Sequence, residues 1–295
     1  MPVKDLSSVH SLVSDLFKWP QSNEEWEQYR LSQEQIDFFN TNGFLGGVKM
    51  LDDAQIDVLR NDLAVLADVH YEGNELFYEY NSNESTNPET ILFHALGAWR
   101  ITPGFHDVLW NPRFVMAASQ LLGNVSVRFW HDQIFYKPAK HGGVVAWHQD
   151  YSYWTRTKPV AHLTCWCALD NATVENGCLQ YVPGSQNWGL LDKPSLAGDL
   201  LGIMDYLNEE QKQEFNPVYV PAKAGEAIFH HPLTLHGSGE NKSNMPRRAF
   251  VINVFEDGVR SDSDDVLLQG VPPIRKGEKM QGQFFPLLFD EGSQS

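Results

Sequence analysis

Hydrophobic positions recur at helical spacing in the first part of the chain. A Ser32 cap and the apolar positions after it predict an amphipathic helix that ends at Asn42-Gly43. A second helix is predicted from about Asp53, where aliphatic residues recur every three or four positions, and a third over residues 109–122. Residues 1–30 are polar with scattered aromatic residues and no sustained period. We expect them to form an arm that packs on the body or on a partner.

The pattern changes at Asn124, after which apolar residues alternate with polar ones or form short β-branched and aromatic runs. Runs of this kind cover residues 125–136, 144–148, 161–169, 178–182, 218–220, 227–230 and 249–255. Turn signals such as Asn176-Gly177 and Pro183-Gly184-Ser185 separate them. Many short strands at this spacing predict a sandwich or a jelly-roll barrel, and therefore a mainly β fold with flanking helices.

The chain is expected to fold as one domain after the arm. We divide it into an arm (1–30) and a domain (31–295) that has a helical part (31–123), a strand-rich core (about 124–256) and a C-terminal tail (257–295). Residues 71–88 have weak periodicity and predict a long loop, and ordered loops of this length often serve as lids or binding elements.

Composition narrows the possible partners. The chain has 22 Lys and Arg against 38 Asp and Glu, a formal net charge of −16, and no basic cluster offsets it. We therefore expect it to bind neither nucleic acid nor membrane, because both present polyanions. Residues 1–19 are interrupted by charges and lack the apolar core of a signal peptide. Three cysteines in a chain without such a signal favour reduced, structural thiols and a cytoplasmic location.

Candidate metal ligands lie near two of the predicted strands. His148 and Asp150 are two apart in a segment of strand character, so their side chains share one face. His236 stands in a His-Gly-Ser-Gly sequence after a turn, where its ring can face a cavity. Two imidazoles and one carboxylate leave further positions on an ion open, as expected for non-haem Fe(II) oxygenases. Taken singly, each residue also has an ordinary explanation, such as a turn-forming Asp or a satisfied histidine.

A candidate anion-binding residue follows downstream. Arg247 opens the last predicted strand, and an arginine that enters a barrel interior requires an anionic partner, such as a carboxylate. Arg248 is the alternative, since either arginine could begin the inward face of that strand, although the spacing favours Arg247. The adjacent histidines His230 and His231 are not expected to bind one ion together, because neighbouring strand residues point to opposite faces.

These motifs, taken together, resemble the phytanoyl-CoA dioxygenase family of Fe(II)- and 2-oxoglutarate-dependent oxygenases. The likeness runs from about Leu31 to Phe255 and includes His148-Gln149-Asp150, Asn176-Gly177-Cys178-Leu179, Pro183-Gly184-Ser185 and His236-Gly237-Ser238-Gly239 with Arg247 after it. The resemblance implies a double-stranded β-helix (jelly-roll, cupin-like) core. It also implies that His148, Asp150 and His236 bind Fe(II), that Arg247 with Ser238 holds the distal carboxylate of 2-oxoglutarate, and that Gln133 and Trp166 contact this cosubstrate.

The resemblance also implies the reaction. Iron, O2 and 2-oxoglutarate would together oxidise an unactivated C–H bond and release succinate and CO2. Relatives that halogenate replace the ligand carboxylate by a small residue, so the presence of Asp150 predicts hydroxylation. A cupin-like isomerase and a non-catalytic metal-binding module remain as alternatives, and Arg247 with Ser238 argues against the isomerase.

The substrate pocket is expected to come from loops, which vary while the metal site stays fixed. A mixed aromatic and polar lining would suit a small-molecule substrate. The candidate pocket residues are Tyr151, Tyr153, Trp154 and Arg156 after the Asp ligand, and Tyr78, Tyr80, His94 and Arg100 from the middle of the chain.

Overall fold

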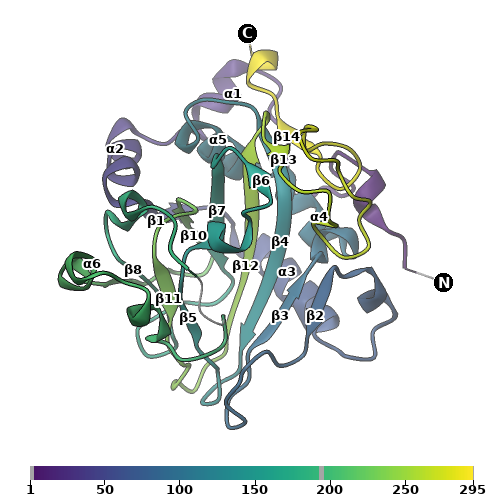
Figure 1. The fold of residues 1–295 in the computed structure, drawn as a ribbon. Coiled ribbons are helices and arrows are strands. Elements are labelled where there is room, and N and C mark those ends of the chain that lie inside the picture. The colour runs from purple at the N-terminus through teal and green to yellow at the C-terminus, as the bar shows by residue number, and fades with distance from the viewer. Residues whose placement is uncertain (1–2, 193–195, 295) are drawn as a thin grey trace.

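Two antiparallel sheets face each other in the computed structural model, which describes residues 3–192 and 196–294 (Figure 1). The remaining residues of the expected arm, core and tail (1, 2, 193–195 and 295) lie outside the described part. The two sheets and the space between them form the double-stranded β-helix that the sequence predicts.

The larger sheet forms the centre of the domain and has eight strands among the described residues. Its order is β1 (Phe44–Lys49), β10 (Glu226–His230), β7 (His162–Ala168), β12 (Arg247–Glu256), β4 (Val127–Lys137), β3 (Phe93–Leu96) and β2 (Glu79–Asn81), and β14 (Leu287–Phe289) also pairs with β4. The long central strands β4 and β12 are antiparallel along most of their length, with Arg247 opposite Lys137.

The smaller sheet closes the other side of the barrel. Its order is β5 (Val145–His148), β11 (His236–Ser238), β8 (Leu179–Tyr181) and β9 (Val218–Val220). A separate two-stranded ribbon joins β6 (Thr157–Lys158) to β13 (Arg260–Ser261) and so ties the C-terminal tail to the segment after β5.

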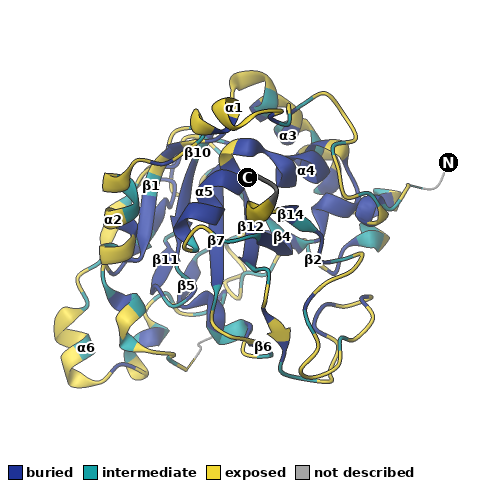
Figure 2. Ribbon diagram, turned by 90° about the horizontal axis from the view of Figure 1, so that it is seen from above, coloured by how far each residue is buried: buried dark blue, intermediate teal, exposed yellow. Residues whose placement is uncertain are grey.

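Helices cover the outer face of the larger sheet. They are α1 (Asn23–Glu27), α2 (Gln33–Asn42), α3 (Asp53–Leu66), α4 (Pro103–Asp107) and α5 (Pro112–Leu121), while α6 (Glu209–Glu214) lies beside the smaller sheet (Figure 1). Short 3-10 helices occur at η1 (Leu6–Ser8), η2 (Glu72–Leu76), η3 (Ala98–Arg100), η4 (Val108–Trp110), η5 (Asp150–Tyr153), η6 (Ser185–Trp188), η7 (Gly202–Asp205) and η8 (Glu291–Gln294). Helices α4 and α5 are buried, whereas α1 and α6 are mostly exposed (Figure 2).

Alternation along β12 shows how the sequence separates core from site. Phe250 and Ile252 point outward into the large hydrophobic core under the helices. Arg247, Val251 and Asn253 point inward and line the cavity between the sheets. Because side chains alternate between faces with a period of two, one strand supplies both the packing that stabilises the domain and the polar groups of the interior.

One segment differs from the sequence-based expectations, and the structure also shows where the arm and the tail lie. Residues 71–88 contain the short strand β2, which extends the larger sheet, in place of an irregular loop. The arm packs on the body, where Asp107 accepts hydrogen bonds from the backbone N–H groups of Val13 and Ser14 at 2.8 Å each. The tail reaches the mouth of the cavity through Leu267 and Leu268. Within the described residues, no helix has the length and apolar character needed to cross a bilayer.

Candidate active site

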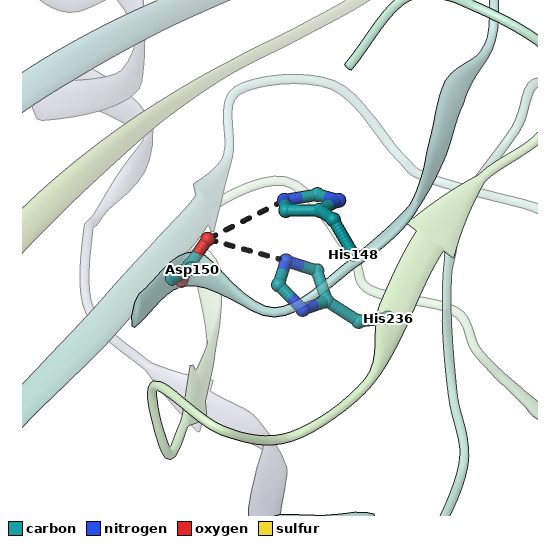
Figure 3. A group of neighbouring side chains, drawn as sticks. All are labelled: His148, Asp150 and His236. Carbon is teal, nitrogen blue, oxygen red and sulfur yellow. Dashed lines mark ion pairs between the residues drawn. The ribbon is translucent and has the colours of Figure 1, made fainter. Parts of the chain in front are cut away.

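The two histidines and the aspartate converge at one end of the cavity between the sheets (Figure 3). His148 lies at the end of β5 and His236 at the start of β11, and these two residues are direct partners in the β5–β11 pairing. Asp150 Oδ1 is 3.4 Å from His148 Nε2 and 3.7 Å from His236 Nε2. Three potential ligand atoms therefore face one point, as a single bound ion requires.

Asp150 reaches this point in a way that the sequence did not predict. The strand ends at His148, and Asp150 is the first residue of the 3-10 helix η5, so the expectation that both lie in one strand is wrong. Gln149 between them keeps extended backbone angles (φ −110°, ψ 132°), so the alternation of side chains continues through Asp150. The turn then takes the chain away from the cavity.

The hydrogen bonds of the two histidines suit metal binding. His148 Nδ1 lies 2.7 Å from the Ala146 carbonyl oxygen, and His236 Nδ1 lies 3.0 Å from that of Thr234. A carbonyl accepts only from N–H, so both rings carry their hydrogen on Nδ1 and present the Nε2 lone pair to the centre. Burial, and next the nearby histidines, lower the pKa of His236 well below its ordinary value, which keeps that ring neutral.

Asp150 completes an anionic donor set. Burial by itself would raise the pKa of this carboxyl, but the neighbouring imidazoles of His236, His148 and His230 lower the pKa well below its ordinary value. The group is therefore ionised at neutral pH. Two neutral imidazoles and one carboxylate form the 2-His-1-carboxylate set that suits Fe(II) with open positions.

A buried guanidinium lies on the opposite sheet, facing the same cavity. Arg247 is 1% exposed, and burial lowers its pKa to about 10. Its Nη2 donates to Ser238 Oγ at 2.6 Å and to the Gly177 carbonyl at 2.9 Å, while its Nε has no hydrogen-bond partner among the described residues. An unpaired buried cation with an unused N–H fits a carboxylate ligand.

Lys137 is a second buried basic residue that the sequence analysis missed. Its side chain is 0% exposed, and Nζ donates to Ser238 Oγ at 2.6 Å and to the Gly239 carbonyl at 2.7 Å. Burial, and next the repulsion from Arg247, lower the pKa of Lys137 well below its ordinary value. The inward parity of β4, which places Gln133, Phe135 and Lys137 on one face, is the sequence signal that could have identified it.

The other cosubstrate candidates also face this end of the cavity. Trp166 on β7 lies with its ring 5.3 Å from the Arg247 guanidinium carbon, and Gln133 on β4 lines the cavity with its amide oxygen 3.2 Å from His94 Nε2. Arg248 points the other way and binds Asp170 through two contacts of 2.8 Å. The strand parity thus places Arg247 inside and Arg248 outside.

The cavity has a volume of about 370 Å³ and extends from the three ligand residues toward the mouth of the barrel. Five of the eight expected pocket residues line it: Tyr78, His94, Tyr153, Trp154 and Arg156. Tyr80 packs on the hydrophobic core instead. The wall also holds Glu79 and Glu84, with Glu84 2.6 Å from His94 Nδ1.

Two further expected pocket residues, Arg100 and Tyr151, are also not among the described residues that line the cavity. Arg100 forms an ion pair with Asp5 of the arm and donates to the Leu76 carbonyl at 2.7 Å. Tyr151 is buried, with its hydroxyl bonded to the Thr157 carbonyl at 2.5 Å. Both polar groups are already used in folding, because the arm and the turn after η5 need these contacts.

Comparison with known proteins agrees with this geometry. The sequence matches the phytanoyl-CoA dioxygenase (PhyH) family over residues 39–249, which is most of the chain. The chain belongs to the phytanoyl-CoA dioxygenase family. As a member, it is a non-haem iron oxygenase that uses 2-oxoglutarate and O2.

Individual relatives of this phytanoyl-CoA dioxygenase family member support the assignment. A phytanoyl-CoA dioxygenase domain-containing protein 1 homolog of Caenorhabditis briggsae is 31% identical over 63% of this chain and 67% of its own length. A methylphosphonate hydroxylase of Gimesia maris is 27% identical over 77% of this chain and 83% of its own length. The epimerase SnoN, solved with Fe3+ and alpha ketoglutarate, has the same fold: its TM-score is 0.72 at 22% identity, with 87% of this chain and 98% of that chain covered.

Proposed function

We propose that this oxygenase hydroxylates an unactivated C–H bond of a small organic substrate that enters the cavity between the two sheets. In the balanced reaction, the substrate R–H, 2-oxoglutarate and O2 give R–OH, succinate and CO2. The observation that carries the proposal is the shared cavity, which has the His148, Asp150 and His236 ligand atoms at one end and the unpaired Arg247 guanidinium across from them. The methylphosphonate hydroxylase among the relatives supports the same outcome.

The residues divide the work as follows. His148, Asp150 and His236 would hold Fe(II), which when bound supplies the redox chemistry that couples decarboxylation of 2-oxoglutarate to substrate oxidation. Arg247 would pair with the distal carboxylate of 2-oxoglutarate. Ser238 has its hydroxyl hydrogen directed to the Gly177 carbonyl at 2.9 Å and accepts from Arg247, so its part is to orient the guanidinium.

Trp166 and Gln133 would flank the cosubstrate. Trp166 closes the cavity beneath Arg247, so its ring both stacks on the guanidinium and excludes water from the carboxylate. Gln133 is kept in place by His94 and can donate from its amide nitrogen toward the cavity. A dry site strengthens the attraction between Arg247 and a bound carboxylate.

The part of the cavity wall away from the metal ligands and Arg247 favours a small molecule over a coenzyme A thioester as the substrate. Its charged residues among the described part of the wall are Glu79, Glu84 and Arg156, and Arg156 already donates to the Val266 and Leu267 carbonyls. Two carboxylates would repel the phosphates of a coenzyme A group, and no lysine is among the described residues that line the cavity. Tyr153 and Trp154 supply the aromatic surface that holds an apolar part of a substrate.

Anaerobic addition of Fe(II) and 2-oxoglutarate tests the proposal. We expect the weak visible charge-transfer band of the iron–keto acid chelate, and then substrate-dependent succinate formation with hydroxylated product from a panel of small metabolites, amino acids and acyl-CoA thioesters. Absence of the band would contradict the assigned metal and cosubstrate sites. Turnover confined to the acyl-CoA thioesters would contradict the small-substrate assignment and leave the oxygenase intact.

Replacing Lys137 with methionine tests the second buried basic residue. We expect the Kd for 2-oxoglutarate to rise roughly tenfold, about 1.4 kcal/mol, because Lys137 Nζ donates to the same Ser238 Oγ that orients Arg247, and its loss leaves the guanidinium less firmly placed. Calorimetric titration with the metal present measures it. Lys140→Met removes an exposed lysine three positions along the chain and is the matched control, for which the Kd should not change. A Lys137→Met Kd equal to that of the control would assign Lys137 to folding alone.

A further inference from the structure

The two oxygens of Asp150 have different surroundings. Oδ1 faces the ligand nitrogens of His148 and His236. Oδ2 faces away from that point and lies 2.6 Å from Thr164 Oγ1 and 2.8 Å from His230 Nε2. One oxygen is therefore available to a metal, while the other is already engaged by two side chains.

The register of the larger sheet creates this second contact. His230 is the last residue of β10 and pairs directly with Thr164 of β7, so their side chains lie on the same face of the sheet. Both point across the barrel to the carboxylate that the turn after β5 presents. His230 is 2% exposed and Thr164 is 2% exposed, so water does not compete for these hydrogen bonds.

The direction of each hydrogen bond follows from the ionised carboxylate. Asp150 can only accept, so His230 must carry its hydrogen on Nε2. His230 Nδ1 is then a lone pair, and it lies 2.9 Å from the hydroxyl of Tyr181, which donates to it. A tyrosine hydroxyl keeps its hydrogen at neutral pH, so it can donate here. The two hydrogen bonds therefore run in the same direction: Tyr181 donates to His230, and His230 donates to Asp150.

This direction also excludes His230 as a metal ligand. Its Nε2 lone pair is occupied by hydrogen, and its Nδ1 lone pair is turned to Tyr181. The ring nevertheless lies close to the centre, 4.2 Å from the ring of His236 between centroids. His230 is therefore close enough to act on the ligands, and it does so through its hydrogen bond to Asp150.

We propose that His230 is a positioning residue which, with Tyr181 and Thr164, holds Asp150 as a one-oxygen ligand of the iron. The proposal rests on the proposed ligand role of Asp150. Carboxylates bind metals through one or both oxygens, and a second bound oxygen would occupy a position that 2-oxoglutarate or O2 needs. Engaging Oδ2 keeps that position open and also fixes the direction of Oδ1.

Three variants test this, with Co(II) as the spectroscopic probe and titrant. His230→Phe keeps a ring and removes the donor, His230→Gln keeps a donor, and Tyr181→Phe removes only the hydroxyl that fixes the His230 hydrogen. We expect His230→Phe to weaken Co(II) binding roughly 10- to 100-fold, as for other residues that support metal ligands, and to change the visible d–d bands because the coordination changes. His230→Gln should restore affinity and bands to near the wild-type state.

The outcomes separate this proposal from the one on which it rests. Wild-type affinity and unchanged bands in a folded His230→Phe protein would overturn the role of His230, as would equal losses in the Phe and Gln variants. If His230→Phe does not fold, Tyr181→Phe decides: a several-fold loss of affinity supports the role, and an unchanged Kd with unchanged bands overturns it. Failure of the wild-type protein to bind Co(II), or unchanged binding by His148→Ala, would instead contradict the metal site itself.

Discussion

Replacing His148 with alanine is expected to abolish iron binding and to reduce turnover of 2-oxoglutarate roughly a thousandfold or more, equal to about 4 kcal/mol of transition-state stabilisation. The ring is one of three ligands, and the remaining His236 and Asp150 leave the ion with too few protein contacts to compete with water. Equilibrium dialysis with Fe(II) and the charge-transfer band measure binding, and succinate formation measures turnover.

The matched control is His70→Ala, which removes an exposed histidine that is not part of the cavity wall. It should bind Fe(II) with the wild-type affinity. Thermal unfolding of both variants without metal checks that the fold is intact, and the hydrogen bond that His148 Nδ1 forms with the Ala146 carbonyl is local to the chain. Retention of the band by a folded His148→Ala protein would contradict the ligand assignment.

Replacing Arg247 with alanine is the second large change. The Kd for 2-oxoglutarate should rise roughly 100-fold, about 2.7 kcal/mol, because a buried carboxylate would lose its charged partner. Metal affinity without the cosubstrate should stay close to wild type, since Arg247 contacts Gly177 and Ser238 and no metal ligand. Arg247→Lys should recover only part of the loss, because an ammonium cannot make the two parallel hydrogen bonds of a guanidinium.

The neighbouring arginine provides a matched control. Arg248→Ala removes the same group one residue along the strand, where it binds Asp170 on the outer face. We expect a modest loss of stability and an unchanged Kd for 2-oxoglutarate. The reverse result, with an unchanged Kd in Arg247→Ala and a large rise in Arg248→Ala, would transfer the cosubstrate role to Arg248.

Much of this architecture could be predicted from the sequence, because its patterns are local. Alternation over β4, β7 and β12 indicates strands, and the caps and apolar spacing indicate α2 and α3. The alternation also requires that only one of Arg247 and Arg248 faces the cavity, and the spacing of the motif favours Arg247. The prediction that Asp150 lies in the strand failed because nothing in the His-Gln-Asp triplet marks a strand that ends two residues before the aspartate.

The contacts of the residues that support the site could not be found in this way, because the partners are far apart in the chain; parity along β4 could have placed Lys137 inside the barrel but not beside Ser238. His230 meets Asp150 across 80 positions, and Lys137 meets Ser238 across 101 positions. Such contacts depend on sheet register, which a single sequence does not specify. Arg100 and Tyr151 were assigned to the pocket for their chemistry alone, and tertiary structure uses both elsewhere.

The C-terminal tail bears on how the substrate preference of such enzymes can be altered. Leu267, Leu268 and Gln269 line the mouth of the cavity, yet they lie beyond residues 39–249, over which the chain matches its family. A segment outside residues 39–249 can be exchanged in the laboratory while the ligands and the arginine stay as they are. Grafting the tail of one relative onto the barrel of another is thus a direct route to new substrate preference with the oxidative chemistry inherited unchanged.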